Sequence, residues 1–421
     1  MNIIPFILWP AYLITLYLLI FWFLFYIIKK DEINQELESN PKLKEYPFVS
    51  IIVPAYNEEK TITKTLNSIV KLNYPKDKLE LIVVNDGSKD KTEEIVKSFI
   101  KKNKNKDIKL ISQNNLGKAS CLNKALSILK GEYFACLDAD SFVDQNALKR
   151  MLFMHTNDGG LAIVTPILKV HEPKTMFQKF QRLEYMASMI IIKLMGFMDC
   201  NFIAPGPFSL YKTRIIKELG GFDENNLVED QEIAYKAQKN HYKIRQCSNA
   251  YVHTVAPKNF KGLSKQRNRW FKGTLLNLFG YRKLLFNKNY GDFGFFQMPI
   301  IFFTFVFAFI AMLSLVYHIF RPFYIYFRNM YLVGFDFMAY LNDISFNYSL
   351  IRMDVLSTFF VYIMLTLSII MIYYSSRLTQ DRVKKYGSIY LIPYFFVYFF
   401  VLSIIAIRVV FELIIGKKQR W

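Results

Sequence analysis

Apolar residues gather into long runs at the two ends of the 421-residue chain, and the segment between them has ordinary charged, periodic patterning. The first run, residues 3–28, ends in Lys29-Lys30-Asp31-Glu32. It is longer than the apolar core of a secretory leader and has neither a leading positive charge nor a small-residue cleavage site. We therefore expect a retained spanning helix. The lysines that follow it predict a cytosolic location for the next segment.

Three more apolar runs follow residue 287, at residues 298–317, 355–374 and 389–415, and each is long enough to cross a bilayer. One span before the middle segment and three after it would leave the basic residues Lys417, Lys418 and Arg420 outside the cell. That placement opposes the positive-inside rule, so the number of spans stays open by one. Arg408 and Glu412, four residues apart in the last run, fit a mutual ion pair and a channel-lining role equally well.

The middle segment alternates short β-branched runs with amphipathic stretches. This alternation predicts an α/β domain, with a mostly parallel sheet and helices on both faces, inserted between membrane helices. We expect a first membrane helix over residues 1–30, a cytosolic domain over 31–275, an interfacial segment over 276–297 and a membrane region over 298–421. The expected strands are residues 49–53, 79–84, 108–112, 133–137 and 162–165, and the expected helices are residues 59–72, 92–102 and 119–129.

The net charge of +20 does not indicate a nucleic-acid partner, because no basic stripe interleaved with aromatic residues accompanies it. We expect the excess of lysine and arginine to face anionic lipid headgroups and an anionic substrate. The four cysteines are scattered without a CxxC pair, so neither a zinc site nor a disulfide framework is predicted.

Acidic or amide residues follow three of the expected strands. The first strand leads into Pro54-Ala55-Tyr56-Asn57-Glu58, the second into Asn85-Asp86-Gly87-Ser88 and the fourth into Asp138-Ala139-Asp140. Ligands of parallel sheets bind beyond the carboxyl ends of the strands, so these groups converge on one crevice. Carboxylates gathered there repel each other unless a cation binds, and hard oxygen ligands beside a diphosphate suit Mg²⁺ or Mn²⁺.

Other pieces of the segment have ordinary structural explanations when each is taken alone. No GxxxxGK[ST] or GxGxxG motif follows the first strand, which excludes the phosphate-loop and dinucleotide classes. Residues 115–119 can approach a phosphate at a helix start or simply form a turn. Glu229 and Asp230 favour a helix amino terminus, and the Arg and Trp of residues 266–270 suit an interfacial helix.

Taken together and in order, the motifs PAYNE, NDGS, NLGKA, DAD, APGPFSLYK, VED and QRNRW are far more specific. The set resembles the processive family-2 glycosyltransferases, which include cellulose, chitin and hyaluronan synthases and bacterial poly-N-acetylglucosamine synthases. The resemblance runs from residue 48 to about residue 273, and the flanking apolar runs agree with it. It implies a glycosyltransferase-A-type domain that binds a nucleotide sugar.

The resemblance implies a role for each donor-side residue at its matching position. Tyr56, Glu58 and Asp86 would contact the uridine part of the donor. Lys118 and Asp138 would lie beside the diphosphate. The second motif departs from the Asp-Asp-Gly-Ser version of some relatives, because Asn85 replaces the first acid.

The resemblance also implies the metal ligand and the general base. Asp140 would hold the Mg²⁺ or Mn²⁺ ion, and Asp230 would take the proton from the acceptor hydroxyl, with Glu229 beside it as a second catalytic candidate. An inverting transfer needs one such base, a neutralised leaving diphosphate and two aligned substrates.

On the acceptor side the resemblance points to two segments. Residues 204–211, with Gly206 among them, match the loop that receives the terminal sugar. Gln266, Arg269 and Trp270 match the QxxRW signature, which binds the diphosphate and the acceptor end in the family.

These residues predict an inverting, metal-dependent transferase that adds sugars from a UDP-sugar to a growing β-linked polysaccharide and passes the polymer across the cell membrane. The APGPFSLYK segment favours UDP-N-acetylglucosamine as the donor. The alternative within enzymes is transfer of one sugar to a lipid-linked acceptor, and outside them a silent channel or scaffold subunit. The expected partners are the donor, a polysaccharide or lipid-linked acceptor, membrane lipids and accessory subunits, with no nucleic acid.

Overall fold

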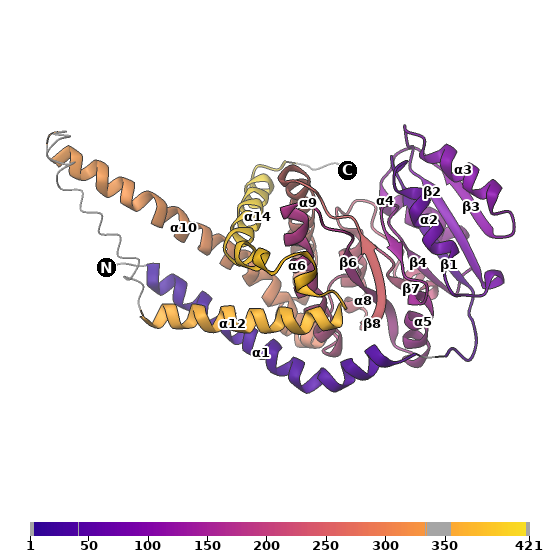
Figure 1. Cartoon of the computed structure of the whole chain (residues 1–421), viewed down its shortest axis with the longest axis horizontal. Coiled ribbons are helices and arrows are strands. Elements are labelled where there is room, and N and C mark those ends of the chain that lie inside the picture. The colour runs from indigo at the N-terminus through magenta and orange to yellow at the C-terminus, as the bar shows by residue number, and fades with distance from the viewer. Residues whose placement is uncertain (1–3, 41, 333, 335–354, 418–421) are drawn as a thin grey trace.

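The computed structural model describes residues 4–40, 42–332, 334 and 355–417, which form an α/β domain with apolar helices extending from it (Figure 1). The domain holds one eight-stranded sheet in the order β3-β2-β1-β4-β7-β6-β8-β5. The predicted α/β domain between apolar helices is confirmed. The strands are β1 (Val49–Ala55), β2 (Leu79–Asn85), β3 (Asp107–Ser112), β4 (Tyr133–Cys136), β5 (Phe142–Val143), β6 (Leu161–Val170), β7 (Leu210–Lys212) and β8 (Lys243–Thr254).

The first half of the sheet is parallel, with β1 paired to both β2 and β4, and β2 paired to β3. The second half is mixed, because β7 runs antiparallel to β4 and β6 while β6 and β8 are parallel. All five predicted strands are present. β5, β7 and β8 were not predicted, because two of them have only two or three residues and β8 mixes polar and apolar positions.

Helices cover both faces of the sheet, as the alternation predicted. On β1, Ile51 and Val53 pack in one core with α2 and α3, whereas Ile52 packs in the other core with α4. Successive side chains of a strand point to opposite faces, so a run that is apolar at every position needs a layer on each side. The domain helices are α2 (Ile62–Val70), α3 (Thr92–Lys102), α4 (Lys118–Ile128), α5 (Ala147–Asn157), α6 (Met176–Phe197), α7 (Thr213–Glu218), α8 (Glu229–Lys239) and α9 (Phe260–Gly280).

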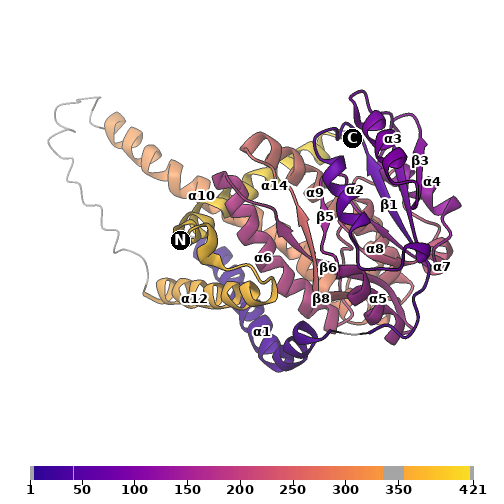
Figure 2. The ribbon, with the colours of Figure 1, turned by 45° about the vertical axis from the view of Figure 1, so that its right-hand side comes forward.

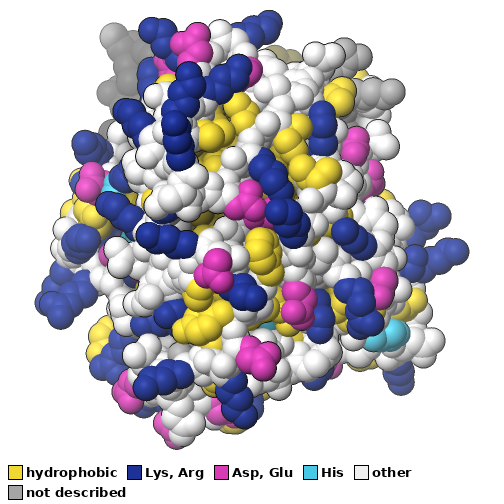
Figure 3. Space-filling view, turned by 90° about the vertical axis from the view of Figure 1, so that its right-hand side faces the viewer, with side chains coloured by type: hydrophobic (Ala, Val, Ile, Leu, Met, Phe, Trp, Pro, Cys, Tyr) yellow, Lys and Arg dark blue, Asp and Glu magenta, His cyan; other side chains and the backbone are white. Residues whose placement is uncertain are grey.

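Four helical segments of the described residues are long and apolar enough to cross a membrane: Trp9–Glu38, Phe293–Ile310, Thr358–Leu378 and Ser388–Ile414. They lie within α1 (Ile4–Glu38), α10 (Met298–Leu332) with the helical turn Phe293–Gln297 before it, α12 (Val355–Leu378), and α14 (Phe399–Ile414) with the short helical turns before it. The helices α1 and α12 run side by side, and α10 projects furthest from the domain (Figures 1 and 2). On the opposite side of the molecule, Lys and Arg side chains are spread over the surface among acidic ones (Figure 3).

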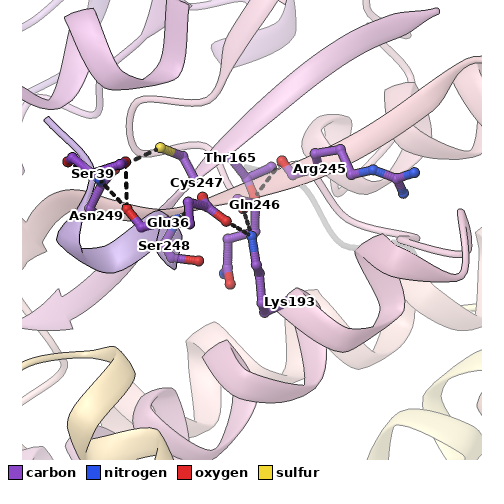
Figure 4. Close-up of polar contacts among 9 residues, drawn as sticks. All are labelled: Glu36, Ser39, Thr165, Lys193, Arg245, Gln246, Cys247, Ser248 and Asn249. Carbon is purple, nitrogen blue, oxygen red and sulfur yellow. Dashed lines mark hydrogen bonds and ion pairs between the residues drawn. The ribbon is translucent and has the colours of Figure 1, made fainter. Parts of the chain in front are cut away.

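The end of α1 is attached to β8 by polar contacts (Figure 4). The Glu36 carboxylate accepts a hydrogen bond from the backbone N–H of Ser248 at 2.7 Å and forms an ion pair with the buried Lys193. The Asn249 amide donates to the Glu36 carbonyl at 2.8 Å. These residues are available because β8 bulges there: its pairing with β6 passes from Gln246 directly to Tyr251. The helix therefore extends eight residues beyond the expected boundary at residue 30 and ends on the domain.

Candidate active site

The predicted site residues that follow β1, β2 and β4 lie together at the carboxyl ends of these parallel strands. The two strands β1 and β2 are in register to their ends, where Ala55 pairs with Asn85, so the residues after them emerge at the same edge of the sheet. The β4 strand ends beside β1, and Asp138 and Asp140 follow it. The predicted convergence on one crevice at this edge therefore agrees with the topology.

Asp86 fixes the loop that precedes α4. Its Oδ1 accepts from the backbone N–H of Leu116 at 3.0 Å, and its Oδ2 accepts from that of Gly117 at 2.9 Å. Gly117 has a φ of 95°, which favours glycine, and Lys118 is the first residue of the helix after it. The carboxylate of the NDGS motif thus positions the lysine of the NLGKA motif, while Tyr56 stands 43% exposed at the end of β1.

The Lys118 ammonium lies between two carboxylates of the site. Its Nζ is 2.6 Å from Oδ1 of Asp138 and 3.0 Å from Oε1 of Glu229. Burial alone would lower the pKa of Lys118, but these two carboxylates raise it well above its ordinary value. The ammonium is therefore charged at any physiological pH and available to an anionic leaving group.

Gly206 leaves the space that this ammonium occupies. A β-carbon at Gly206 would stand 2.5 Å from Lys118 Nζ and 3.3 Å from Oδ2 of Asp138. The backbone N–H of Gly206 donates to Oδ2 of Asp230 at 3.2 Å. The predicted acceptor loop is thus in direct contact with the predicted base and the predicted diphosphate-binding lysine.

Asp230 lies at the start of α8 beside Glu229, and its carboxylate is incompletely satisfied. Among the described residues, Oδ1 of Asp230 and Oε2 of Glu229 are buried without a hydrogen-bond partner. Burial, and then repulsion from Glu229, raise the pKa of Asp230 to about 6, against the opposing charges of Lys118 and Arg269. A carboxylate with this pKa and a free oxygen is suited to accept a proton near neutral pH.

Asp140 has a similar electrostatic environment on the other side of the crevice. Burial, then the charges of Asp138 and Glu58, raise its pKa to about 7, and the Ser141 hydroxyl donates to its Oδ1 at 3.1 Å. Burial and the charge of Asp138 also raise the pKa of Glu58. In the part of the chain that the structure describes, no group of three or more His, Cys, Asp or Glu side chains forms a ready metal site. The residues fit a hard divalent cation that completes its shell with substrate oxygens.

The QRNRW residues lie on α9, close to the base. Arg269 donates to the Leu227 carbonyl at 3.5 Å, just ahead of Glu229, and its charge lowers the pKa of Asp230. The Oε1 of Gln266 accepts from Arg267 at 3.2 Å, and the Arg267 guanidinium lies 4.1 Å from the centre of the Trp270 ring. The three signature residues therefore share one helix, and two of them, Gln266 and Trp270, contact the same buried residue, Arg267.

This buried arginine is part of a group that the sequence did not reveal. Arg267 is 1% exposed, and its Nη2 donates to Oε2 of Glu184 on α6 at 2.5 Å. The same carboxylate oxygen accepts from the Tyr398 hydroxyl at 2.8 Å. Glu184 follows the polar residues Gln181 and Arg182 in α6, so no local pattern distinguishes it, and its partner is 83 residues away.

Residues 50–220 match the glycosyl transferase family 2 model. The poly-beta-1,6-N-acetyl-D-glucosamine synthase of Staphylococcus epidermidis is 30% identical over 278 residues, and that of Staphylococcus aureus strain N315 is 30% identical over 279 residues. Each match covers 65% of this chain and 66% of the relative. A solved mannosyltransferase from Pyrobaculum calidifontis, in complex with GDP-Man and Mn²⁺, is 22% identical with a TM-score of 0.49, covering 64% of this chain and 75% of its own.

Proposed function

Because the chain belongs to glycosyltransferase family 2, as its motifs predicted, we propose that it is an inverting, processive polysaccharide synthase. The donor is a UDP-sugar, with UDP-N-acetylglucosamine favoured, and the acceptor is the end of a growing β-linked polysaccharide. The relatives that share 30% identity are poly-beta-1,6-N-acetyl-D-glucosamine synthases, which supports this donor.

One observation carries the proposal: the buried Oδ1 of Asp230 has no hydrogen-bond partner among the described residues and lies beside the Gly206 loop, close to Lys118. Asp230 removes the proton of the acceptor hydroxyl as that oxygen attacks the anomeric carbon. The bond from that carbon to the phosphate oxygen breaks in the same step, and UDP leaves with the electron pair. A single in-line displacement of this kind inverts the anomeric configuration.

The remaining residues bind the donor and stabilise the charge that develops on the diphosphate. Lys118 and Arg269 supply fixed positive charge there. Asp140 would hold a Mg²⁺ or Mn²⁺ ion, which when bound would neutralise the leaving diphosphate, and Asp138 would lie beside that diphosphate.

The outer parts of the site bind the two substrates. We assign Tyr56, Glu58 and Asp86 to the uridine side, where Asp86 also orders the loop before α4. On the acceptor side, Gln266 and Trp270 contact the sugar chain, and the indole ring offers a stacking surface for a sugar ring. They share α9 with Arg269, whose charge acts on Asp230, and this supports the assignment.

We place the catalytic domain on the cytosolic side of a membrane that the chain crosses several times. Lys29 and Lys30 in α1 support this orientation, because positive charge is enriched on the cytosolic side. A polar polymer made in the cytosol must cross lipid, and apolar helices fused to the catalytic domain provide a protein-lined route. We keep the catalytic domain at about residues 31–275, although α1 continues to Glu38 and α9 to Gly280.

The test offers radiolabelled UDP-N-acetylglucosamine, UDP-glucose and GDP-mannose to the purified full chain in nanodiscs, with Mg²⁺ or Mn²⁺. Nucleotide release and product size are followed, and Asp230→Asn is the control. We expect a metal-dependent product of high mass from UDP-N-acetylglucosamine alone, and none from Asp230→Asn. A product of one sugar on a lipid would establish the alternative, and turnover that survives Asp230→Asn would refute the assignment of the base.

A further inference from the structure

The apolar segment Ser388–Ile414 begins in contact with the catalytic domain. The Lys179 ammonium, near the start of α6, lies 3.0 Å from the Tyr390 hydroxyl and 4.1 Å from the centre of the Tyr390 ring. The middle of the segment touches the same domain, where Tyr398 donates to Glu184 of α6 and packs against the buried Phe180 and Leu263.

The far end of the segment also contacts the catalytic domain, on α9. The Asn268 amide, inside the QRNRW motif, donates to Oε2 of Glu412 at 3.1 Å. The ammonium of Lys272, which is 3% exposed, lies 3.7 Å from Glu412 and donates to the backbone carbonyl of Lys417 at 2.5 Å. This part of α9 is firmly within the domain, because one turn later Asn277 donates to Gln231 of α8.

In the part of the chain that the structure describes, the polar contacts of α1 and α12 with the domain lie at one end of each helix. On α1 that end is Glu36, and on α12 it is the turn after Leu378, where Asp381 accepts two hydrogen bonds from Arg182 at 2.7 and 2.8 Å. The far ends of these two helices meet each other instead, with the rings of Trp9 and Phe360 5.5 Å apart. Figure 1 shows α1, α10 and α12 leading away from the domain, whereas α14 runs beside α6 and α9.

A helix that crosses a bilayer must place its two ends on opposite sides of about 30 Å of hydrocarbon. A helix whose two ends are both bonded to the same water-facing domain cannot do so. We propose that Ser388–Ile414 lies at the membrane surface, between the catalytic domain and the lipid, and does not cross. The partner of its outer face is the interfacial zone of the bilayer.

The exposed side chains of the segment suit that partner. The face turned away from the domain is apolar and rich in aromatic residues, whereas Tyr398, Ser403, Ile405, Ala406 and Val409 are buried against the protein. Glu412, at the end of the segment that contacts α9, forms ion pairs with Arg408, Lys272 and Lys417. The exposed apolar side chains are Ile389, Ile392, Phe396, Val397, Phe399, Phe400, Ile404, Phe411 and Ile414.

A surface position for Ser388–Ile414 also agrees with the positive-inside rule at the end of the chain. With α1, α10 and α12 as the three crossings, the residues after α14 return to the side of the catalytic domain. Lys417, Lys418 and Arg420 then follow the positive-inside rule together with Lys29 and Lys30. The segment also connects the membrane surface to the acceptor side of the site. Its Tyr398 donates to Glu184, which binds Arg267, and Arg267 lies over the ring of Trp270.

The test labels single introduced cysteines with a membrane-impermeant maleimide in inverted and right-side-out vesicles that hold the full chain. The four native cysteines are buried, so the parent protein gives a low background. Ser127→Cys reports the catalytic-domain side, Tyr331→Cys the far end of α10, and Lys417→Cys the end of the segment; all three positions are exposed.

We expect Lys417→Cys to be labelled in the same vesicles as Ser127→Cys and to lose labelling in those where Tyr331→Cys reacts. Labelling of Lys417→Cys together with Tyr331→Cys would overturn the proposal. If Lys417→Cys reacts in neither, a reporter fused after Trp421 decides: fluorescent protein folded on the Ser127 side supports the proposal, and active phosphatase on the other side refutes it. This readout needs no sugar transfer, so it is independent of the proposed enzyme activity.

Discussion

Two regions of the same sheet bury carboxylates in opposite ways. In the body of the sheet, Glu80 of β2 is 0% exposed, yet Oε1 accepts from the Ser50 hydroxyl at 2.5 Å and the Lys130 backbone N–H at 2.6 Å. Its Oε2 accepts from the Lys109 ammonium at 2.9 Å. Burial alone would raise the pKa of Glu80, but these donors outweigh it and the pKa is lowered.

At the carboxyl edge of the sheet the balance is reversed. Asp140 and Asp230 have raised pKa values, chiefly because they are buried and close to other carboxylates, and Asp230 keeps one oxygen without a partner among the described residues. A buried polar group without its hydrogen bond costs about 1–3 kcal/mol of stability. A fold that satisfies Glu80 completely but keeps Asp140 and Asp230 with raised pKa values has positioned these two carboxylates for a ligand and a proton.

Replacing the proposed base Asp230 should have the largest effect on turnover. Asp230→Asn preserves the shape but cannot take up the acceptor proton, so we expect turnover to fall by about 10²–10⁴-fold. UDP release from the purified protein measures the loss, and UDP binding followed by calorimetry shows whether the donor site survives. Loss of UDP binding as well would mean that Asp230 holds the fold of the site rather than the proton.

Removing the predicted metal ligand should have the next largest effect. Asp140→Asn relieves the repulsion from Asp138 and Glu58 but removes a hard anionic ligand, and we expect turnover to fall by about 10²–10³-fold. The variant should also lose its response to added Mg²⁺ or Mn²⁺, as measured by titration of each ion. An unchanged metal titration would exclude Asp140 as a ligand.

The pH profile tests the raised pKa of the base. Protonation of Asp230 removes its ability to accept a proton, so kcat/KM should decline below a pH of about 6. Each further pH unit should then cost about tenfold, because the deprotonated fraction falls in that proportion. Stopped assays from pH 5 to 8 measure the profile, and a flat profile down to pH 5 would contradict the assignment.

Glu184 lies beside the site, but its carboxylate accepts from two side-chain donors, Arg267 and Tyr398. It therefore combines the full hydrogen bonding of Glu80 with a position next to the acceptor-side residues. We expect Glu184→Gln to weaken its bond to Arg267 and loosen Trp270, raising the acceptor KM by about tenfold, since one hydrogen bond to a charged group contributes roughly 1.5–3 kcal/mol. Binding of UDP should not change. Product length and acceptor titration provide the readout, with the exposed carboxylate change Glu218→Gln as the control.

Replacing Glu80, whose carboxylate has all its hydrogen bonds, should have the smallest effect on catalysis. Glu80→Gln should leave turnover per folded molecule unchanged while lowering the free energy of unfolding by about 1–3 kcal/mol, through lost charge-assisted hydrogen bonds. Because the folded pKa of Glu80 is lowered, its stabilisation is present above the unfolded pKa and disappears as the pH falls through the folded one. Thermal unfolding at pH 7 and at pH 4 measures the difference between parent and variant, which should shrink at pH 4.

The parallel half of the fold was predictable because its signal is local. Strands β1 to β4 are short runs rich in β-branched or aromatic residues and are separated by helices, and the acids Asp86, Asp138 and Asp140 come soon after strands. The topology of a parallel sheet then brings them to one edge.

The second half depends on contacts between residues that are distant in sequence. The strand β7 has three residues and pairs with β4 and β6, which no local pattern announces. In the sequence, Arg267 and Glu184 have the pattern of ordinary charged helix residues, and only the tertiary structure shows that they form a hydrogen bond. The fourth apolar run has the length and composition of a span, and only its contacts with α6 and α9 argue otherwise.

The attachment of α1 to the bulge of β8 has a practical consequence for protein engineering. A soluble catalytic fragment that begins after Glu36 would leave the Lys193 ammonium buried without its counter-ion, at a cost of roughly 3–5 kcal/mol. The backbone N–H of Ser248 would lose its acceptor at the same time. A fragment intended for crystals or screening should therefore keep the last turns of α1, or replace Lys193 by methionine, to remain folded without a membrane.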